Sequence, residues 1–161
     1  MIAKQQSVSQ MTNSEIIKII EAAKAQGKIV VATNGCFDIL HLGHLKYLER
    51  SKALGDILVV GLNSDASVKK LKGESRPINS GTDRAALLLG LKPVDHVIIF
   101  DELDASEFLR MVKPNIYTKG ADYQAESLPE YAASQEIGAK IELIELVDGK
   151  STSSIIKKMH D

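Results

Sequence analysis

Short apolar runs alternate regularly with segments of helical pattern along this chain, and that alternation constrains the fold more than any other feature. Five apolar runs are predicted to be buried strands, at residues 29–32, 56–61, 95–100, 114–118 and 140–144. Helical segments are predicted between and after them, at residues 42–54, 82–91, 106–112, 129–137 and 153–159. Strands that alternate with helices favour right-handed βαβ crossovers, so we predict an α/β fold with a parallel sheet covered on both faces. Ligands of such sheets bind beyond the carboxyl ends of the strands.

A further helix is predicted before the first strand. Thr12 and Glu15 form a capping-box pattern, and the isoleucine-rich segment that follows ends near Gly27. We therefore divide the chain into an N-terminal tail and helix, residues 1–27, and a main domain, residues 28–161. The apolar face of this helix must be buried against the domain or against a second subunit, and we expect a homodimer or a higher homo-oligomer.

Composition excludes several classes of protein. The 161 residues are 44% hydrophobic and 25% charged, which is typical of one globular domain. A formal net charge of −1 gives no field that would attract nucleic acid or an anionic membrane, and no apolar stretch is long enough to span a bilayer. The single cysteine excludes an internal disulfide and the N-terminus lacks the apolar core of a signal peptide, so we expect a cytoplasmic protein.

The stretch between the first strand and helix 42–54 is the most informative for function. His41 and His44 lie three residues apart where the helix begins, so they share one helical face. The first turn of a helix offers unpaired N–H groups and the positive end of the helix dipole, which attract anions. The pattern predicts a phosphate site with two imidazoles. A zinc site is disfavoured, because Cys36 is the only cysteine and no acidic residue stands at ligand spacing.

These residues carry a resemblance to a known family. Residues 34–38 followed by His41-Leu42-Gly43-His44 resemble the signature of the nucleotidyltransferase superfamily that includes glycerol-3-phosphate cytidylyltransferase and pantetheine-phosphate adenylyltransferase. Four more segments are similar to the adenylyltransferase half of the bifunctional heptose enzyme of lipopolysaccharide precursor synthesis, at residues 60–67, 71–77, 119–123 and 148–158. The resemblance runs from about residue 28 to the C-terminus.

The resemblance implies a Rossmann-like, doubly wound, five-stranded sheet and a defined reaction. A sugar-phosphate oxygen would attack the α-phosphorus of ATP and expel pyrophosphate. In such a transfer the protein has to align the two substrates and stabilise the developing negative charge, and His41, His44 and Lys72 are expected to do this. The acceptor would be D-glycero-β-D-manno-heptose 1-phosphate and the product ADP-heptose. Mg²⁺ would be held by phosphates and water, with no metal-binding residues, and a separate kinase is expected to make the sugar phosphate.

The resemblance also implies a set of nucleotide contacts. The expected residues are Asn34, Gly35, Cys36, Phe37, Asp38, His41, Gly43, His44, Asn63, Arg84, Lys119, Gly120, Asp122, Ser151, Thr152 and Ser153.

Several of these residue types also suit structural roles. Gly35 suits a plain turn, Cys36 and Phe37 suit packing, and Asp38 suits a carboxylate that holds the turn through backbone N–H groups. The hydroxyls of residues 151–154 suit helix capping.

The basic residues have alternatives of their own. Arg84 could pair with the neighbouring Asp83 rather than with a phosphate. Lys69, Lys70 and Lys72 are placed in a mobile loop, where the resemblance favours Lys72 as a phosphate ligand and the charge run alone favours a solvated face.

Two other functions remain open from the sequence. One is a cytidylyltransferase acting on glycerol 3-phosphate or a related alcohol phosphate. Residues 148–150 depart from the arginine-bearing pattern usual in those enzymes, and this departure favours ATP. The other is a nucleotide sensor that binds ATP without turnover, which is disfavoured because a sensor needs no groups aimed at a leaving pyrophosphate.

Overall fold

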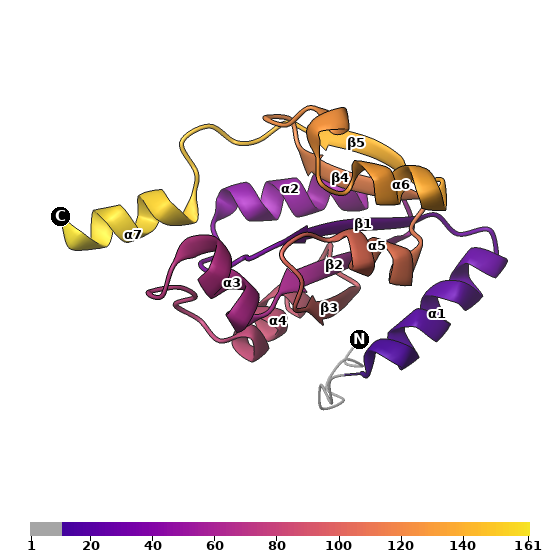
Figure 1. Cartoon of the computed structure of the whole chain (residues 1–161), viewed down its shortest axis with the longest axis horizontal. Helices are drawn as coiled ribbons and strands as arrows, with labels where there is room; N and C mark the ends of the chain where they lie inside the picture. Colours follow the sequence, from indigo (N-terminus) through magenta and orange to yellow (C-terminus); the bar gives the residue numbers. More distant parts are fainter. Residues whose placement is uncertain (1–10) are drawn as a thin grey trace.

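Five parallel strands form one sheet in the order β3-β2-β1-β4-β5 (Figure 1). The computed structural model describes residues 11–161 of the chain. The strands are β1 (Val30–Gly35), β2 (Ile57–Asn63), β3 (His96–Phe100), β4 (Ile116–Gly120) and β5 (Lys140–Ile144). The strand order reverses between β1 and β4, which places a ligand crevice beyond their carboxyl ends. The predicted doubly wound α/β architecture is confirmed.

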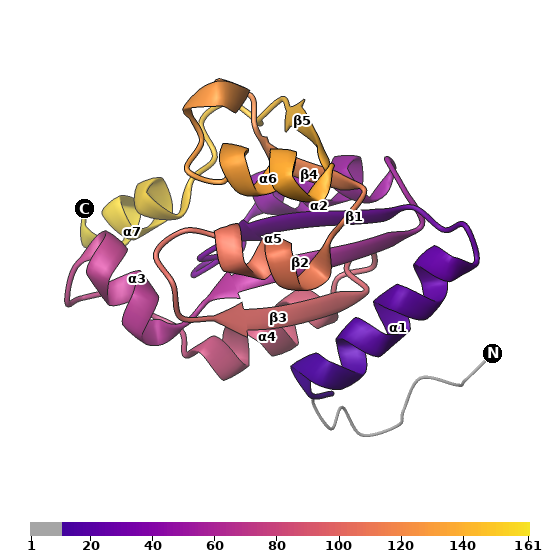
Figure 2. The same ribbon diagram turned by 45° about the vertical axis from the view of Figure 1, so that its right-hand side comes forward.

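Helices cover both faces of the sheet (Figure 2). Helices α1 (Asn13–Ala25), α5 (Ser106–Val112) and α6 (Tyr131–Ile137) pack over one face, where residues such as Phe108 and Tyr117 form the core. Helices α2 (Leu42–Lys52) and α4 (Gly81–Leu89) cover the other, around Leu48 and Leu88. Three remaining elements lie outside these layers: α3 (Asp65–Lys72), the 3₁₀ turn η1 (Ala125–Ser127) and α7 (Thr152–His160). Among residues 11–161, no helix has the length and apolar character needed to span a bilayer.

The first strand continues further than its apolar run. The prediction ended this strand at residue 32, but β1 extends to Gly35 because Thr33, Asn34 and Gly35 pair with the buried β2 strand. This pairing is made by backbone N–H and C=O groups, and it does not depend on apolar side chains. The polar ends of the strands therefore project from the sheet directly into the region where a ligand would bind.

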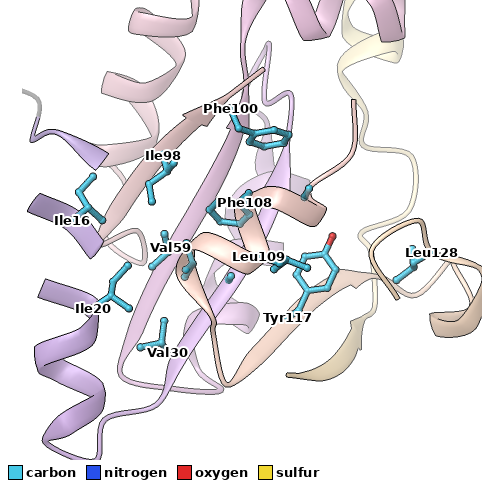
Figure 3. Packing of buried hydrophobic residues seen from close by; sticks show 13 residues of the cluster. Ile16, Ile20, Val30, Val59, Ile98, Phe100, Phe108, Leu109, Tyr117 and Leu128 are labelled. Atoms are coloured by element: carbon cyan, nitrogen blue, oxygen red, sulfur yellow. The ribbon is translucent and has the colours of Figure 1, made fainter. Parts of the chain in front are cut away.

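Helix α1 is buried against the chain's own sheet. The predicted capping box is present, with the Glu15 N–H donating to Thr12 Oγ1 at 3.2 Å and the Thr12 N–H donating to a Glu15 carboxylate oxygen at 2.7 Å. Ile16 and Ile20 point into the cluster that contains Ile98 (Figure 3). This resolves the alternative that the sequence left open, since the apolar face of α1 is already covered within the chain. The N-terminal tail before Met11 lies outside the described residues.

The segment that carries the lysine run is helical, which corrects the predicted loop. Helix α3 starts at a Ser64 cap, whose side-chain oxygen accepts from the Ser67 N–H, and it ends at Gly73, which has φ +102°. Only Ser67 and Val68 are buried in α3, so its apolar periodicity is too weak to reveal a helix. The irregular segment is instead the connection of residues 73–80 between α3 and α4.

Candidate active site

A cavity of about 620 Å³ lies at the carboxyl ends of β1, β2 and β4. It gathers sixteen of the seventeen residues predicted for catalysis or nucleotide binding, all but Arg84. They are Asn34, Gly35, Cys36, Phe37, Asp38, His41, Gly43, His44, Asn63, Lys72, Lys119, Gly120, Asp122, Ser151, Thr152 and Ser153.

The two histidines are stacked at the start of α2. Their ring centroids lie 3.8 Å apart with an interplanar angle of 23°. His41 is the N-cap residue, and its Nδ1 accepts from the His44 N–H at 3.4 Å. That bond assigns the proton of a neutral His41 ring to Nε2, which leaves Nε2–H free to donate. Within residues 11–161, the buried Nδ1 of His44 has no hydrogen-bond partner.

Both imidazoles are held in the neutral form. Burial lowers the pKa of His44 to about 4, and the neighbouring His41 acts in the same direction. Burial also lowers the pKa of His41, with a contribution from the positive charge of Lys150. At neutral pH each ring therefore offers one N–H donor, and a bound anion would be needed to favour the charged form.

The glycine between the histidines leaves room for the surrounding groups. A Cβ on Gly43 would lie 2.9 Å from the Cε1 and Nδ1 atoms of His41 and 3.0 Å from the Cβ of Lys150. At Gly35 the corresponding space is filled by the Phe37 ring, 2.8 Å away. Gly35 thus makes room for this ring, and Phe37 in turn packs against His44 with ring centroids 5.1 Å apart.

Asp38 ties the β1–α2 turn to the segment that follows α3. Its buried carboxylate accepts from Arg76 Nε at 2.7 Å and from the backbone N–H groups of Ile78 and Asn79 at 2.8–2.9 Å. Burial alone would raise the pKa of Asp38, but the hydrogen bonds from Asn79, Ile78 and Arg76 outweigh it and the net pKa is lowered. The turn-holding role considered for Asp38 accounts for these contacts.

Arg84 differs from its expected place. Its side chain is 1% exposed and does not line the cavity. The guanidinium donates to the carbonyl oxygens of Cys36, Asn63 and Asn79 at 2.7–3.0 Å. It also pairs with Asp65, at 2.7 Å, rather than with the adjacent Asp83. Carbonyls at the ends of β1 and β2 need donors, and Arg84 supplies them.

A second helix N-terminus meets the cavity at α7. Ser151 caps this helix, accepting from the Ser154 N–H at 3.0 Å, and the Thr152 hydroxyl donates to the Ile39 carbonyl at 2.9 Å. Ser153 lines the cavity and is exposed. The capping role therefore takes one hydroxyl, Thr152 anchors α7 to the β1–α2 turn, and Ser153 is left facing the cavity.

The end of β4 forms another side of the cavity. Asn34 Oδ1 accepts from the Tyr117 hydroxyl at 2.6 Å and from Lys119 Nζ at 3.3 Å. The same ammonium lies 5.6 Å from the centre of the Tyr123 ring, which also lines the cavity. These contacts connect the polar ends of β1 and β4 through their side chains.

Sequence reasoning missed two cations of the site. Arg76 and Lys150 line the cavity together with the predicted Lys72. Both belong to segments that carried the resemblance, and Lys150 directly precedes the hydroxyl-rich start of α7, a signal that could have identified it. Residues 11–161 contain no cluster of three His, Cys, Asp or Glu side chains arranged to hold a metal ion.

Comparison with known proteins places the chain in a family. The family described as "Cytidylyltransferase-like" matches residues 32–158, a range that includes the histidine pair and the α7 start. The chain belongs to this cytidylyltransferase-like family of nucleotidyltransferases. The sequence resemblance to that superfamily is thereby confirmed.

Several proteins that are similar to this chain are much longer than it. "Bifunctional protein HldE" of Nitratiruptor sp. is 50% identical over 145 residues, which cover 90% of this chain and 30% of that protein. "Bifunctional protein HldE" of Campylobacter concisus is 55% identical over 134 residues, covering 83% of this chain and 28% of that protein. The chain thus spans less than a third of the length of these relatives.

A solved structure shares the fold. The lipopolysaccharide core biosynthesis protein from Thermoplasma volcanium superposes with a TM-score of 0.61 at 37% identity, covering 77% of this chain and all of that one.

Proposed function

We propose that the protein transfers AMP from ATP to a sugar 1-phosphate and releases pyrophosphate. The observation that carries this proposal is the stacked pair His41 and His44 at the N-terminus of α2, inside a cavity lined by Lys72, Arg76 and Lys150. Donors and cations placed around one cavity suit a triphosphate better than they suit a neutral ligand.

Positioning and charge stabilisation are the protein's tasks in such a transfer. The acceptor phosphate oxygen attacks the α-phosphorus, and the bond from this phosphorus to the bridging oxygen of the diphosphate breaks. The N–H groups of His41 and His44 would donate to α- and β-phosphate oxygens, where negative charge increases. No covalent intermediate on the protein is needed, so Cys36, whose pKa is raised mainly by burial, acts as a packing residue.

The cationic groups divide between the two ends of the triphosphate. Lys150 adjoins His41 and so lies next to the imidazole pair, while Lys72 and Arg76 come from α3 and from the segment after it. The N-termini of α2 and α7 contribute backbone N–H groups and the positive ends of their dipoles. Mg²⁺, if bound as the triphosphate complex, would be held by phosphate oxygens and water.

The acceptor we propose is D-glycero-β-D-manno-heptose 1-phosphate, with ADP-heptose as product. The motifs at residues 60–67, 71–77, 119–123 and 148–158 support this choice, because they are similar to the heptose branch of the superfamily. The related protein from Thermoplasma volcanium is named a lipopolysaccharide core biosynthesis protein, and this name supports the same class of sugar.

Pyrophosphate release tests the proposal. ATP and CTP are each supplied with heptose 1-phosphate, other sugar 1-phosphates and glycerol 3-phosphate. We expect turnover with ATP and the heptose; turnover only with CTP and glycerol 3-phosphate would replace this function with the cytidylyltransferase alternative. Nucleotide binding without turnover on any acceptor would favour a sensor.

Single substitutions connect this activity to the histidines. His41→Ala and His44→Ala are each expected to lower kcat by about 10²-fold, because each removes a donor to the developing charge. Lys46→Ala is the matched control, since Lys46 lies on the same helix, is exposed and pairs with Glu49. Near-normal kcat in either histidine variant would contradict the assigned roles.

A further inference from the structure

The cavity has a second wall, away from the histidines, that the proposed chemistry leaves unused. We call it the α5–α6 wall and define it as Leu103, Asp104, Leu128, Pro129 and Glu130. These residues come from the segments that lead into α5 and α6, the helices on the sheet face opposite α2. The wall is therefore separated from the start of α2 by the ends of the strands themselves.

Glu130 is the unusual member of this wall. The residue is 2% exposed, and its Oε1 accepts from the Ala105 N–H at 3.0 Å. Among residues 11–161, nothing donates to its Oε2, which is buried. A buried carboxylate oxygen without a hydrogen bond is costly, so it calls for an explanation.

Capping of α5 does not explain a carboxylate here. Ala105 precedes the first residue of α5, and one oxygen acceptor satisfies its N–H, so a glutamine would serve equally. No ion pair joins Glu130 to a cation within the described part of the chain. The second oxygen is thus an acceptor for which the described part of the chain supplies no donor.

The strand ends connect Glu130 to the proposed phosphate site. The carboxylate of Glu130 interacts electrostatically with the Tyr117 hydroxyl. The pKa of Tyr117 is raised mainly by burial, and the negative charge of Glu130 raises it further. The Tyr117 hydroxyl donates to Asn34 Oδ1, at the end of β1 and the start of the histidine motif. Glu130 and Asn34 thus line the same cavity, and Tyr117 interacts with both of them.

We propose that Glu130 recognises the acceptor by accepting a hydrogen bond from a sugar hydroxyl through Oε2. This inference rests on the proposed function, and it assigns the α5–α6 wall to the hydroxyl-bearing end of the acceptor. A carboxylate only accepts hydrogen bonds, so it selects donors and repels phosphates. The acceptor is then oriented with its phosphate toward the cations and its ring hydroxyls toward Glu130.

The wall has to shift slightly for this contact to form, because Oε2 is closed off from water in the free protein. Such a shift makes recognition dependent on the acceptor: a ring with a hydroxyl at the right position satisfies the oxygen, and a ring without it leaves the oxygen unpaired. Sites that must satisfy a buried polar group discriminate strongly against ligands that lack the matching group. The acceptor class is a polyhydroxylated sugar phosphate.

Glu130→Gln is the direct test, because glutamine keeps the acceptor for the Ala105 N–H and replaces the second oxygen with a donor. We expect the KM for the sugar 1-phosphate to rise about 10- to 100-fold, the range expected for loss of a hydrogen bond to a charged group, with the KM for ATP unchanged. A series of single-deoxy acceptors should show one position at which the wild-type protein discriminates and the variant does not.

Ser134→Ala is the matched control. The Ser134 hydroxyl is also buried without a partner in the described residues, lies one helical turn after Glu130 and does not line the cavity. It should leave both KM values unchanged. Should Glu130→Gln fail to fold, Glu130→Asp keeps the charge but retracts it, and the same acceptor-specific rise in KM is expected.

The outcomes separate this inference from the proposed function. Unchanged acceptor KM and unchanged deoxy discrimination in a folded Glu130 variant that still turns over would overturn the role of Glu130 while leaving the transferase intact. Equal rises in the KM values for ATP and acceptor would also overturn it, because they indicate a general structural role. Absence of turnover on every acceptor in the wild-type protein would reject the proposed function itself.

Discussion

The neutral state of the stacked imidazoles is the most consequential feature at the scale of single residues. His44 is held neutral mainly by burial, with its pKa lowered to about 4. Two uncharged rings can lie 3.8 Å apart without repulsion, and each still donates one hydrogen bond. A triphosphate that binds along the edges of these rings meets donors that need no proton uptake at neutral pH.

The lowered pKa of His44 makes stability depend on pH. The unfolded histidine titrates near its ordinary value of about 6.5 and so binds a proton before the folded one does as pH falls. The stabilisation associated with neutral His44 is present above pH of about 6.5 and is lost as pH falls towards 4. At pH 5 the expected loss in the free energy of unfolding is about 2 kcal/mol.

Urea unfolding of the wild type and of His44→Leu at pH 7 and pH 5 measures this loss. The variant should lose less stability than the wild type between the two pH values. An equal decrease in both proteins would show that His44 is not the group responsible.

Local sequence predicted the site residues whose roles depend on their immediate neighbours. The spacing of His41 and His44 predicted that both lie at the start of α2, and the hydroxyl run predicted that one of its members caps α7, which is Ser151 in the structure. The role of Asp38 as an acceptor of backbone N–H groups was also predicted, but the partners of Asp38 and Arg84 could not be identified in this way, because they lie up to 48 residues away in sequence. Their contacts depend on how α4 and residues 73–80 fold back over the strand ends.

At the scale of the elements, the three lysines of α3 show how a run of charged residues can include one residue of the site. Lys69, Lys70 and Lys72 share this helix, but only Lys72 lines the cavity. A short helix presents its residues on different faces, so three similar lysines acquire different surroundings. The weak apolar pattern of α3 is why the sequence suggested a loop there.

Lys72→Ala should lower kcat and weaken ATP binding, whereas Lys69→Ala on the same helix should change neither. The reason is that removal of one cation from a triphosphate site costs charge-assisted hydrogen bonds, about tenfold or more in kcat/KM. Steady-state kinetics with varied ATP gives both values. Indistinguishable variants would return Lys72 to the solvated-face interpretation.

Helix α1 packs against the sheet of its own chain and contributes to the hydrophobic core. Ile20 is fully buried in the core, whereas its neighbour Ile19 is 38% exposed. Ile20→Ala should lower the free energy of unfolding by about 2–5 kcal/mol, and Ile19→Ala should change it far less. Denaturant unfolding with the mass in solution recorded alongside tests both variants. A change of oligomeric mass in Ile19→Ala with little loss of stability in Ile20→Ala would indicate instead that α1 serves a subunit contact.

At the scale of the whole molecule, the strand order determines where chemistry occurs. The reversal between β1 and β4 opens the cavity. The N-termini of α2 and α7, the cations Lys72, Arg76, Lys119 and Lys150, and Glu130 all line it. The alternation of apolar runs predicted the sheet and the edge at which ligands bind. It could not predict the α5–α6 wall, because that wall combines residues 103–104 and 128–130, which only the folded chain brings together.

The most direct test of the account is a crystal structure with a non-hydrolysable ATP analogue. We predict that α- and β-phosphate oxygens lie within about 3 Å of the Nε2 atoms of His41 and His44, at the start of α2. A triphosphate bound elsewhere, with both rings still packed against the protein, would contradict the central claim.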